Sequence, residues 1–129
     1  MFHKKVFIIR FIHYIMPAIL ITTNYHIDQE KDLIKEISHE MAALLDKPED
    51  HFTISWTHAN KILRGGDFTN FIIFQIYSIG GLNKEINSQI CPVLTKILQK
   101  YNIAEDMIDF IFQDIKPENW GKHFGVFDH

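Results

Sequence analysis

The sequence predicts an α/β (α+β) fold in which two βαβ units form a four-stranded mixed sheet with two helices on one face. Three observations support this fold class. The chain has 129 residues, enough for one domain with a real core. Short apolar, β-branched runs alternate with longer segments whose apolar residues recur at helical spacing. The order strand, helix, strand occurs twice without an intervening linker, which indicates one sheet built from two similar halves.

The first half starts with residues 18–23 (AILITT), a β-branched run of strand length that stops at Asn24. We expect Asp28 to cap the helix that follows. Pro48 is expected to end this helix, since the residue before a proline is pushed out of the α region. Residues 51–58 (HFTISWTH) then alternate as a half-buried strand. The apolar face of the helix consists of Leu33, Ile34, Ile37, Met41, Leu44 and Leu45.

The second half repeats this order after a turn at residues 64–67 (RGGD). Residues 71–78 (FIIFQIYS) form a strongly apolar strand that ends before Gly80-Gly81. In the next helix, Pro92 removes a backbone donor, so the helix either kinks there or starts late. Residues 107–113 (MIDFIFQ) form the closing strand. The apolar positions of this second helix are Ile86, Ile90, Val93, Leu94, Ile97, Leu98 and Tyr101.

Composition excludes several classes of function. Hydrophobic residues make up 47% and charged residues 22% of the chain, with a net charge of -3, so neither nucleic acid nor an anionic membrane is an expected partner. Cys91 is the one cysteine, which excludes an intrachain disulfide and a thiolate metal cluster. The eight histidines lack the spacing of a helical zinc site. We expect neither a metal nor a cofactor.

Residues 1–15 (MFHKKVFIIRFIHYI) form an N-terminal extension with a basic start and an apolar stretch. Arg10 and His13 interrupt this stretch, no small-x-small cleavage site follows it, and it is shorter than the roughly 20 apolar residues that span a bilayer. We expect the extension to lie upstream of a working start at Met16, so that the domain spans residues 16–129. A cleaved leader and a retained extra strand are the alternatives.

Several motifs together resemble a known family in their order and approximate spacing. They are Met16-Pro17 before a strand that ends in Thr-Asn, Lys47-Pro48, Gly65-Gly66, Ser78-Ile79-Gly80-Gly81-Leu82-Asn83, Gly121, and the apolar tail from Phe124 to Phe127. Each motif alone is common, but in register with a duplicated βαβ pattern they are specific. The chain from Met16 to about Phe127 resembles the macrophage migration inhibitory factor family of the tautomerase superfamily.

This resemblance implies a homotrimer whose sheets surround a central channel, with a pocket at each subunit interface. Family members tautomerise phenylpyruvate- and dopachrome-type substrates without a cofactor. The resemblance places Pro17 at the base of the pocket as the general base, and Lys47, Ser78 and the backbone N–H of Ile79 around the carboxylate of a keto acid. Some members are also secreted without a signal peptide and act as cytokines through receptors. Cytoplasmic residence is the default expectation here, with leaderless secretion as the alternative.

The chemistry of keto–enol conversion agrees with these roles. The reaction needs a base near neutral pH to take a proton from the carbon next to a carbonyl. An ordinary α-amino group titrates at about 7.7–8.0, and an apolar pocket with a lysine beside it lowers that pKa. Only an N-terminal Pro17 has such an amine, because an internal Pro17 is an amide. Taken singly, Pro17 reads as a strand-entry residue, Lys47 as a helix-end cation and Ile79 as a core residue.

The sequence also departs from the family pattern around the pocket. Asp109 stands where the closing strand commonly offers a tyrosine from the neighbouring subunit, and Ile111 replaces an asparagine. Lys122 replaces the aromatic after the C-terminal glycine, although Trp120 and Phe124 lie close by. We expect these residues to form an altered pocket rim. The runner-up function is therefore a trimeric, cytokine-like binding protein with a weak or vestigial pocket. The Cys-x-x-Cys pair of mammalian members is absent, so thiol-oxidoreductase activity is not expected.

Overall fold

The protein is described by a computed structural model in which residues 17–128 are placed. The predicted extension, residues 1–15, and Met16 lie outside the described residues. The main elements are β1 (Ala18–Thr23), α2 (Glu30–Leu45), β2 (Thr53–His58), β5 (Ile72–Ser78), α3 (Lys84–Gln99) and β6 (Ile108–Asp114). Short 3-10 turns lie at Glu49–His51, Glu105–Met107 and Pro117–Asn119.

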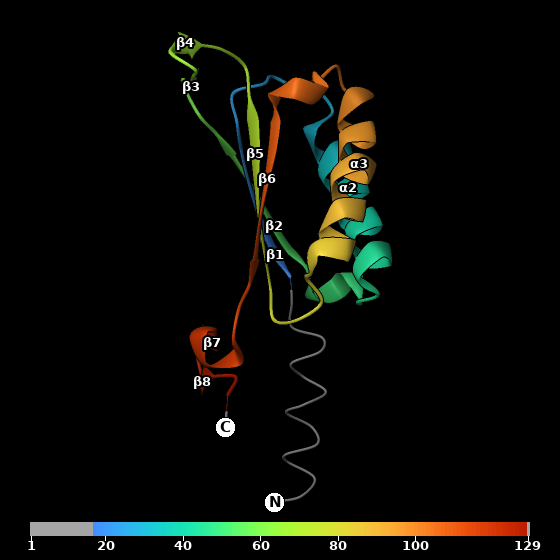
Figure 1. Ribbon diagram of the computed structural model, residues 1–129, viewed down its shortest axis with the longest axis vertical. Helices are drawn as coiled ribbons and strands as arrows, with labels where there is room; N and C mark the ends of the chain where they lie inside the picture. Colours follow the sequence, from blue (N-terminus) through green and yellow to red (C-terminus); the bar gives the residue numbers. More distant parts are fainter. Residues whose placement is uncertain (1–16, 129) are drawn as a thin grey trace, which may run out of the picture.

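The four long strands form the mixed sheet that the sequence predicts, and their order in the structure is β2-β1-β5-β6. Pairing is parallel within each half, β1 with β2 and β5 with β6, and antiparallel where the halves meet, β1 with β5. Both helices lie side by side on one face of this sheet (Figure 1). Because β1 runs against β5 and β6, β1 begins at the end of the sheet where β5 and β6 finish.

The core lies between the sheet and the two helices. Alternate residues of β1 and β5 point into it, which explains their regular burial pattern. The helices contribute residues at three- and four-residue spacing, so each buries one apolar stripe. The core residues of these four elements are Ile19, Ile21, Leu33, Ile37, Met41, Leu45, Ile72, Phe74, Ile76, Ile90, Leu94, Ile97 and Leu98.

Helix α2 differs from the sequence prediction at both ends. Its N-cap is Gln29, whose side chain makes no capping hydrogen bond, so the prediction of Asp28 as the cap is wrong. The helix ends at Leu45 because Asp46 adopts the left-handed conformation, with φ of 51°. Its N–H bonds back to the carbonyls of Ala42 and Ala43. The chain therefore leaves the helix before Pro48 acts on it.

Helix α3 begins at Lys84, so the late start that Pro92 allowed is wrong. Asn83 caps the helix, and its side-chain oxygen accepts a hydrogen bond of 2.9 Å from the N–H of Ile86. Pro92 lies inside the helix on an exposed side. Water can reach the carbonyl of Ser88, which loses its backbone donor to the proline, and this reduces the cost of the missing bond.

Two small hairpins project from opposite ends of the sheet (Figure 1). Strands β3 (Leu63–Arg64) and β4 (Asp67–Phe68) flank Gly65-Gly66, confirming the predicted turn. Both glycines have positive φ, 61° and 87°, as a tight hairpin turn requires. Strands β7 (Gly121–Lys122) and β8 (Gly125–Val126) form the second hairpin. Neither helix among residues 17–128 has the length and apolar character needed to cross a membrane.

Candidate active site

Pro17 lies at the end of the sheet where β1 begins. The residue is buried, and its carbonyl accepts a hydrogen bond of 3.2 Å from the N–H of Thr53 on β2. On the other side of β1, Ala18 pairs with Tyr77 in the antiparallel ladder with β5. Extending this register by one position sets Pro17 beside Ser78. The predicted base therefore lies next to the predicted binding segment.

Lys47 reaches the same place from the end of α2. The left-handed turn at Asp46 redirects the chain, and the Lys47 N–H bonds to the Ala42 carbonyl at 3.1 Å. The Lys47 Nζ donates to Ser78 Oγ at 3.2 Å and to the Ile79 carbonyl at 3.4 Å. Burial lowers the pKa of Lys47 from its ordinary value of 10.5, and the negative charge of Asp114 partly opposes this shift. A half-buried cation thus stands beside Ser78, the residue that the sheet register sets next to Pro17.

Residues 78–81, here called the 78–81 turn, continue from the end of β5. The buried Ser78 Oγ donates to the Gly80 carbonyl at 2.7 Å. Gly80 and Gly81 have positive φ, 76° and 84°, which glycine adopts without strain. The Ser78 carbonyl accepts from Ile115 on the β6 side, at 2.8 Å. In a trans peptide the N–H points opposite to the carbonyl, so the Ile79 N–H points toward β1 and Pro17.

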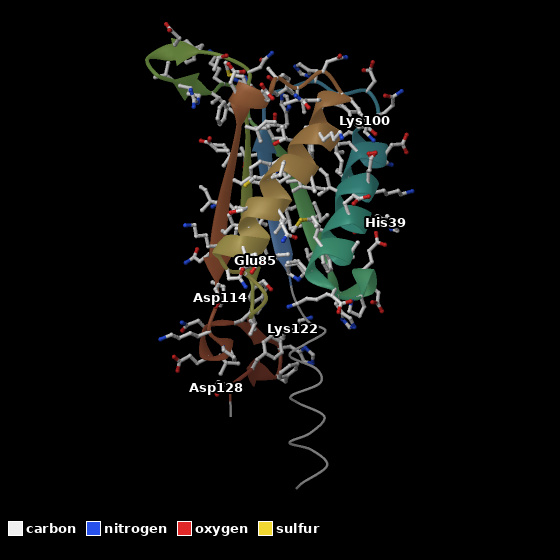
Figure 2. The ribbon with its side chains drawn as sticks, turned by 45° about the vertical axis from the view of Figure 1, so that its right-hand side comes forward. His39, Glu85, Lys100, Asp114, Lys122 and Asp128 are labelled. Carbon is white, nitrogen blue, oxygen red and sulfur yellow. The ribbon has the colours of Figure 1, made fainter. Side chains whose placement is uncertain are left out.

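Asp114 is a residue of this site that the sequence analysis missed. It is the last residue of β6, paired in register with Ser78, and its Oδ1 accepts a hydrogen bond of 2.8 Å from the Gly80 N–H. Figure 2 shows it at the end of the sheet nearest the C-terminal hairpin. The signal was present in the sequence, since parallel strands bring their carboxyl ends to one edge, and β5 and β6 end in Ser78 and Asp114.

Two predicted rim residues, Trp120 and Phe124, belong to the C-terminal segment that packs on this end of the sheet. The Ile79 side chain is buried against Phe127, with Trp120 packed beside them. Phe124 is 52% exposed, and its ring centre lies 5.5 Å from that of Phe127. Lys122, in place of an aromatic, lies on the hairpin strand β7. The C-terminal segment thus fixes Ile79 and leaves an aromatic ring at the surface nearby.

The other two predicted rim residues, Asp109 and Ile111, are not brought to this site within one chain. Both are exposed on β6 and lie opposite Ile73 and Gln75 of β5. From Ile73 to Ser78 the strand rises about 16 Å, at about 3.3 Å per residue. Within one chain, Asp109 and Ile111 therefore do not reach Pro17.

Within residues 17–128, no group of three or more His, Cys, Asp or Glu side chains is placed to hold a metal ion. The groups that meet at the site are one ammonium, one hydroxyl, one carboxylate and backbone donors. This set suits the binding of a small anion next to a base. Among these groups, the Lys47 ammonium and the Ile79 N–H are the two that can bind a carboxylate.

Comparison with known proteins gives one family and many structures. The family model for macrophage migration inhibitory factor (MIF) matches residues 16–128. A MIF homologue from Prochlorococcus marinus has a TM-score of 0.78 and 24% identity, over 87% of this chain and 100% of that chain. A MIF-like protein from Entamoeba histolytica has a TM-score of 0.71 and 26% identity, over 84% of this chain and 96% of its own.

A third solved structure, a fused 4-OT described as a symmetric trimer, has a TM-score of 0.75 and 16% identity. The alignment covers 85% of this chain and 96% of the fused chain. No curated protein sequence matches this chain.

The duplicated βαβ sheet is the fold that this chain shares with these solved structures. The chain belongs to the macrophage migration inhibitory factor family, whose model matches all but the first residues and the last one.

Proposed function

We propose that this chain is a cofactor-free keto–enol tautomerase that acts on phenylpyruvate- or dopachrome-type substrates, with Pro17 as the general base. One observation carries the proposal: Pro17, the Lys47 ammonium and the Ile79 N–H converge around Ser78, although they come from three distant parts of the sequence. A base beside a cation and a backbone donor is the minimum that the reaction needs.

The roles follow from this geometry. Lys47 and the Ile79 N–H bind the carboxylate of the keto acid and fix its orientation. Pro17 takes the proton from the carbon next to the carbonyl, and its nitrogen becomes a positively charged amine. The electron pair of the broken C–H bond moves into the enolate, which the nearby Lys47 charge stabilises. The protonated Pro17 amine then gives its proton to the enolate oxygen, which yields the enol and restores the neutral base, and the reverse steps give the ketone.

This mechanism requires Pro17 to be the first residue of the working protein. With Met16 attached, the proline nitrogen is a tertiary amide that can neither donate nor accept a proton. The family match starts at residue 16, which supports a working start at Met16 followed by loss of that methionine. A chain that keeps residues 1–15 is expected to be catalytically silent.

A homotrimer is part of the proposal, because one chain lacks the rim of its own pocket. Asp109 and Ile111 lie about 16 Å and about 10 Å along the sheet from Ser78 in the same chain, at about 3.3 Å per residue. A neighbouring subunit would supply them. The trimeric state of the fused 4-OT, which shares this fold, supports such an assembly.

The test compares protein that begins at Pro17 with the full-length chain. Enol–keto conversion of phenylpyruvate is followed by absorbance for both forms and for Pro17→Gly in the shorter form. We expect the shorter form to be faster by about 10²- to 10⁴-fold, the usual contribution of a general base. Intact-mass measurement on protein from the native cell identifies the mature N-terminus. Equal rates for both forms, or a full rate for Pro17→Gly, would show that Pro17 is not the base.

A second function, a cytokine-like trimeric binding protein, is favoured by one observation. The rim positions carry an exposed carboxylate at Asp109 and an exposed aliphatic side chain at Ile111. Such a rim suits a receptor surface as well as a keto acid. This function has no need of Pro17 chemistry, and it adds leaderless secretion to the cytoplasmic residence that we propose by default. A folded trimer beginning at Pro17 without activity on any keto acid would favour it.

A further inference from the structure

The peptide unit that joins Ile79 to Gly80 lies between two opposite charges. Its carbonyl oxygen accepts from Lys47 Nζ at 3.4 Å, and its N–H donates to Asp114 Oδ1 at 2.8 Å. The peptide dipole therefore has its negative end toward the ammonium and its positive end toward the carboxylate. Both contacts are favourable, and together they fix the plane of this peptide. The Ile79 N–H belongs to the adjacent peptide unit of the 78–81 turn.

We propose that Asp114 is a positioning residue of the site: its carboxylate holds the 78–81 turn so that the Ile79 N–H faces the substrate, and its negative charge favours the nearby Lys47 ammonium. This inference rests on the proposed function, because it assigns a role at the same keto-acid site. Asp114 acts through Gly80 and Lys47 and does not itself touch the substrate. Without this positioning role, a carboxylate at this point would only repel the negatively charged keto acid.

The surroundings of Lys47 show why one carboxylate matters. From β5 it meets a neutral hydroxyl, Ser78, and from the 78–81 turn a carbonyl. Gly81 lies close as well, since a Cβ there would stand 3.6 Å from Lys47 Cε. At the start of β1 lies Pro17, whose amine adds positive charge when protonated. Among the described residues, Asp114 on β6 is an ionisable side chain whose charge favours the ammonium. Burial works against the ammonium, and the negative charge of Asp114 opposes that effect in part.

Two variants separate the charge of Asp114 from its hydrogen bond, and a third serves as their control. Asp114→Asn keeps an oxygen for the Gly80 N–H but removes the charge. Asp114→Ala removes both. Glu85→Gln is the matched control, because it removes one negative charge from the first turn of α3 at the same end of the molecule (Figure 2).

The first measurement is the pH titration of Lys47 by NMR in the full chain without substrate, with the signal assigned by its absence in Lys47→Met. We expect Lys47 to titrate at lower pH in both Asp114 variants than in the wild type, and at an unchanged pH in Glu85→Gln. This result does not depend on activity. It therefore decides the charge role of Asp114 even if the tautomerase proposal fails.

The second measurement is steady-state kinetics with phenylpyruvate on protein that begins at Pro17, which retains the whole sheet and both helices. We expect Asp114→Ala to raise KM by about tenfold to a hundredfold, as misplaced binding groups do, and Asp114→Asn to raise it less. Unchanged Lys47 titration and unchanged KM in both Asp114 variants would overturn the proposal. If Asp114→Ala does not fold, Asp114→Asn still decides it through the titration.

Discussion

At the scale of single residues, Lys47 is a side chain that serves the site and lowers the stability of the fold. Burial disfavours its ammonium, and the two oxygens that it contacts, Ser78 Oγ and the Ile79 carbonyl, carry no full charge. Asp114 provides the opposing charge from the neighbouring strand end. A lysine in this setting is useful for binding an anion, and it carries an energetic cost when no anion is bound.

The lowered pKa of Lys47 predicts a pH dependence of stability. Below this pKa, Lys47 is protonated in both the folded and unfolded chain, so the full burial cost is present. As pH rises from the lowered pKa toward 10.5, the unfolded chain binds more protons and the folded state gains stability. We therefore expect the melting temperature of the wild type, relative to Lys47→Met, to rise between neutral pH and pH 10.5. Thermal unfolding at several pH values measures this.

The control for that measurement is Lys35→Met, since Lys35 is exposed on α2. Its difference from the wild type should not vary with pH over the same range. A constant difference between the wild type and Lys47→Met would contradict the prediction.

The candidate site was predicted from sequence where a local motif marked it. Pro17, Lys47, Ser78 and Ile79 each belong to a short pattern, and the structure brings them together. Asp114 was missed because a single acidic residue at a strand end resembles any solvated side chain. Its role depends on the register between β5 and β6, and the sequence of either strand alone does not contain that register.

At the scale of secondary-structure elements, the two helices begin in different ways. Asn83 caps α3 with its side chain, whereas Gln29 makes no such bond at the start of α2. We expect Asn83→Ala to lower the free energy of unfolding by about 1 kcal/mol, because the Ile86 N–H loses its partner. Gln29→Ala is the matched variant and should change it by less than about 0.5 kcal/mol. Urea unfolding of both measures the contrast. Equal losses in the two variants would be the opposite result.

Most of the long elements were predictable because their apolar periodicity covers many residues. Strand β1 has the predicted bounds, and β5 starts one residue later than expected. The predicted strand at 51–58 begins instead at Thr53, because Glu49–His51 forms a 3-10 turn after Pro48. The hairpin strands β3, β4, β7 and β8 were not predicted, since two-residue strands are too short to show a period. The prediction of Asp28 as the cap was wrong because several polar residues precede α2, and the sequence does not tell which of them begins the helix.

At the scale of the whole molecule, the described chain leaves one face of its sheet without a covering layer (Figure 1). Leu20 and Ile111 are 37% and 52% exposed on that side. Strands β2 and β6 are also open edges, which stable proteins usually cover or pair. We expect sedimentation at micromolar concentration to show a trimer.

A pair of variants tests that assembly. Ile111→Asp sets a charge on the open face of β6 and should shift the protein toward the monomer. Ala43→Asp introduces the same side chain on the exposed surface of α2 and should leave the trimer intact. A monomeric wild type, or equal behaviour of the two variants, would argue against a trimer built on this face.

The antiparallel meeting of the two halves also has a kinetic consequence. Because β1 runs against β5, the start of β1 lies beside the end of β5. The site therefore combines groups from residue 17, residue 47, the 78–81 turn and residue 114. Each of these contacts closes a long loop of chain, and such contacts form late, after the loop entropy has been lost. Neither half contains the site by itself. During refolding, Lys47 and Asp114 therefore meet the 78–81 turn only once both halves have docked, and ligand binding reports completion of the entire sheet.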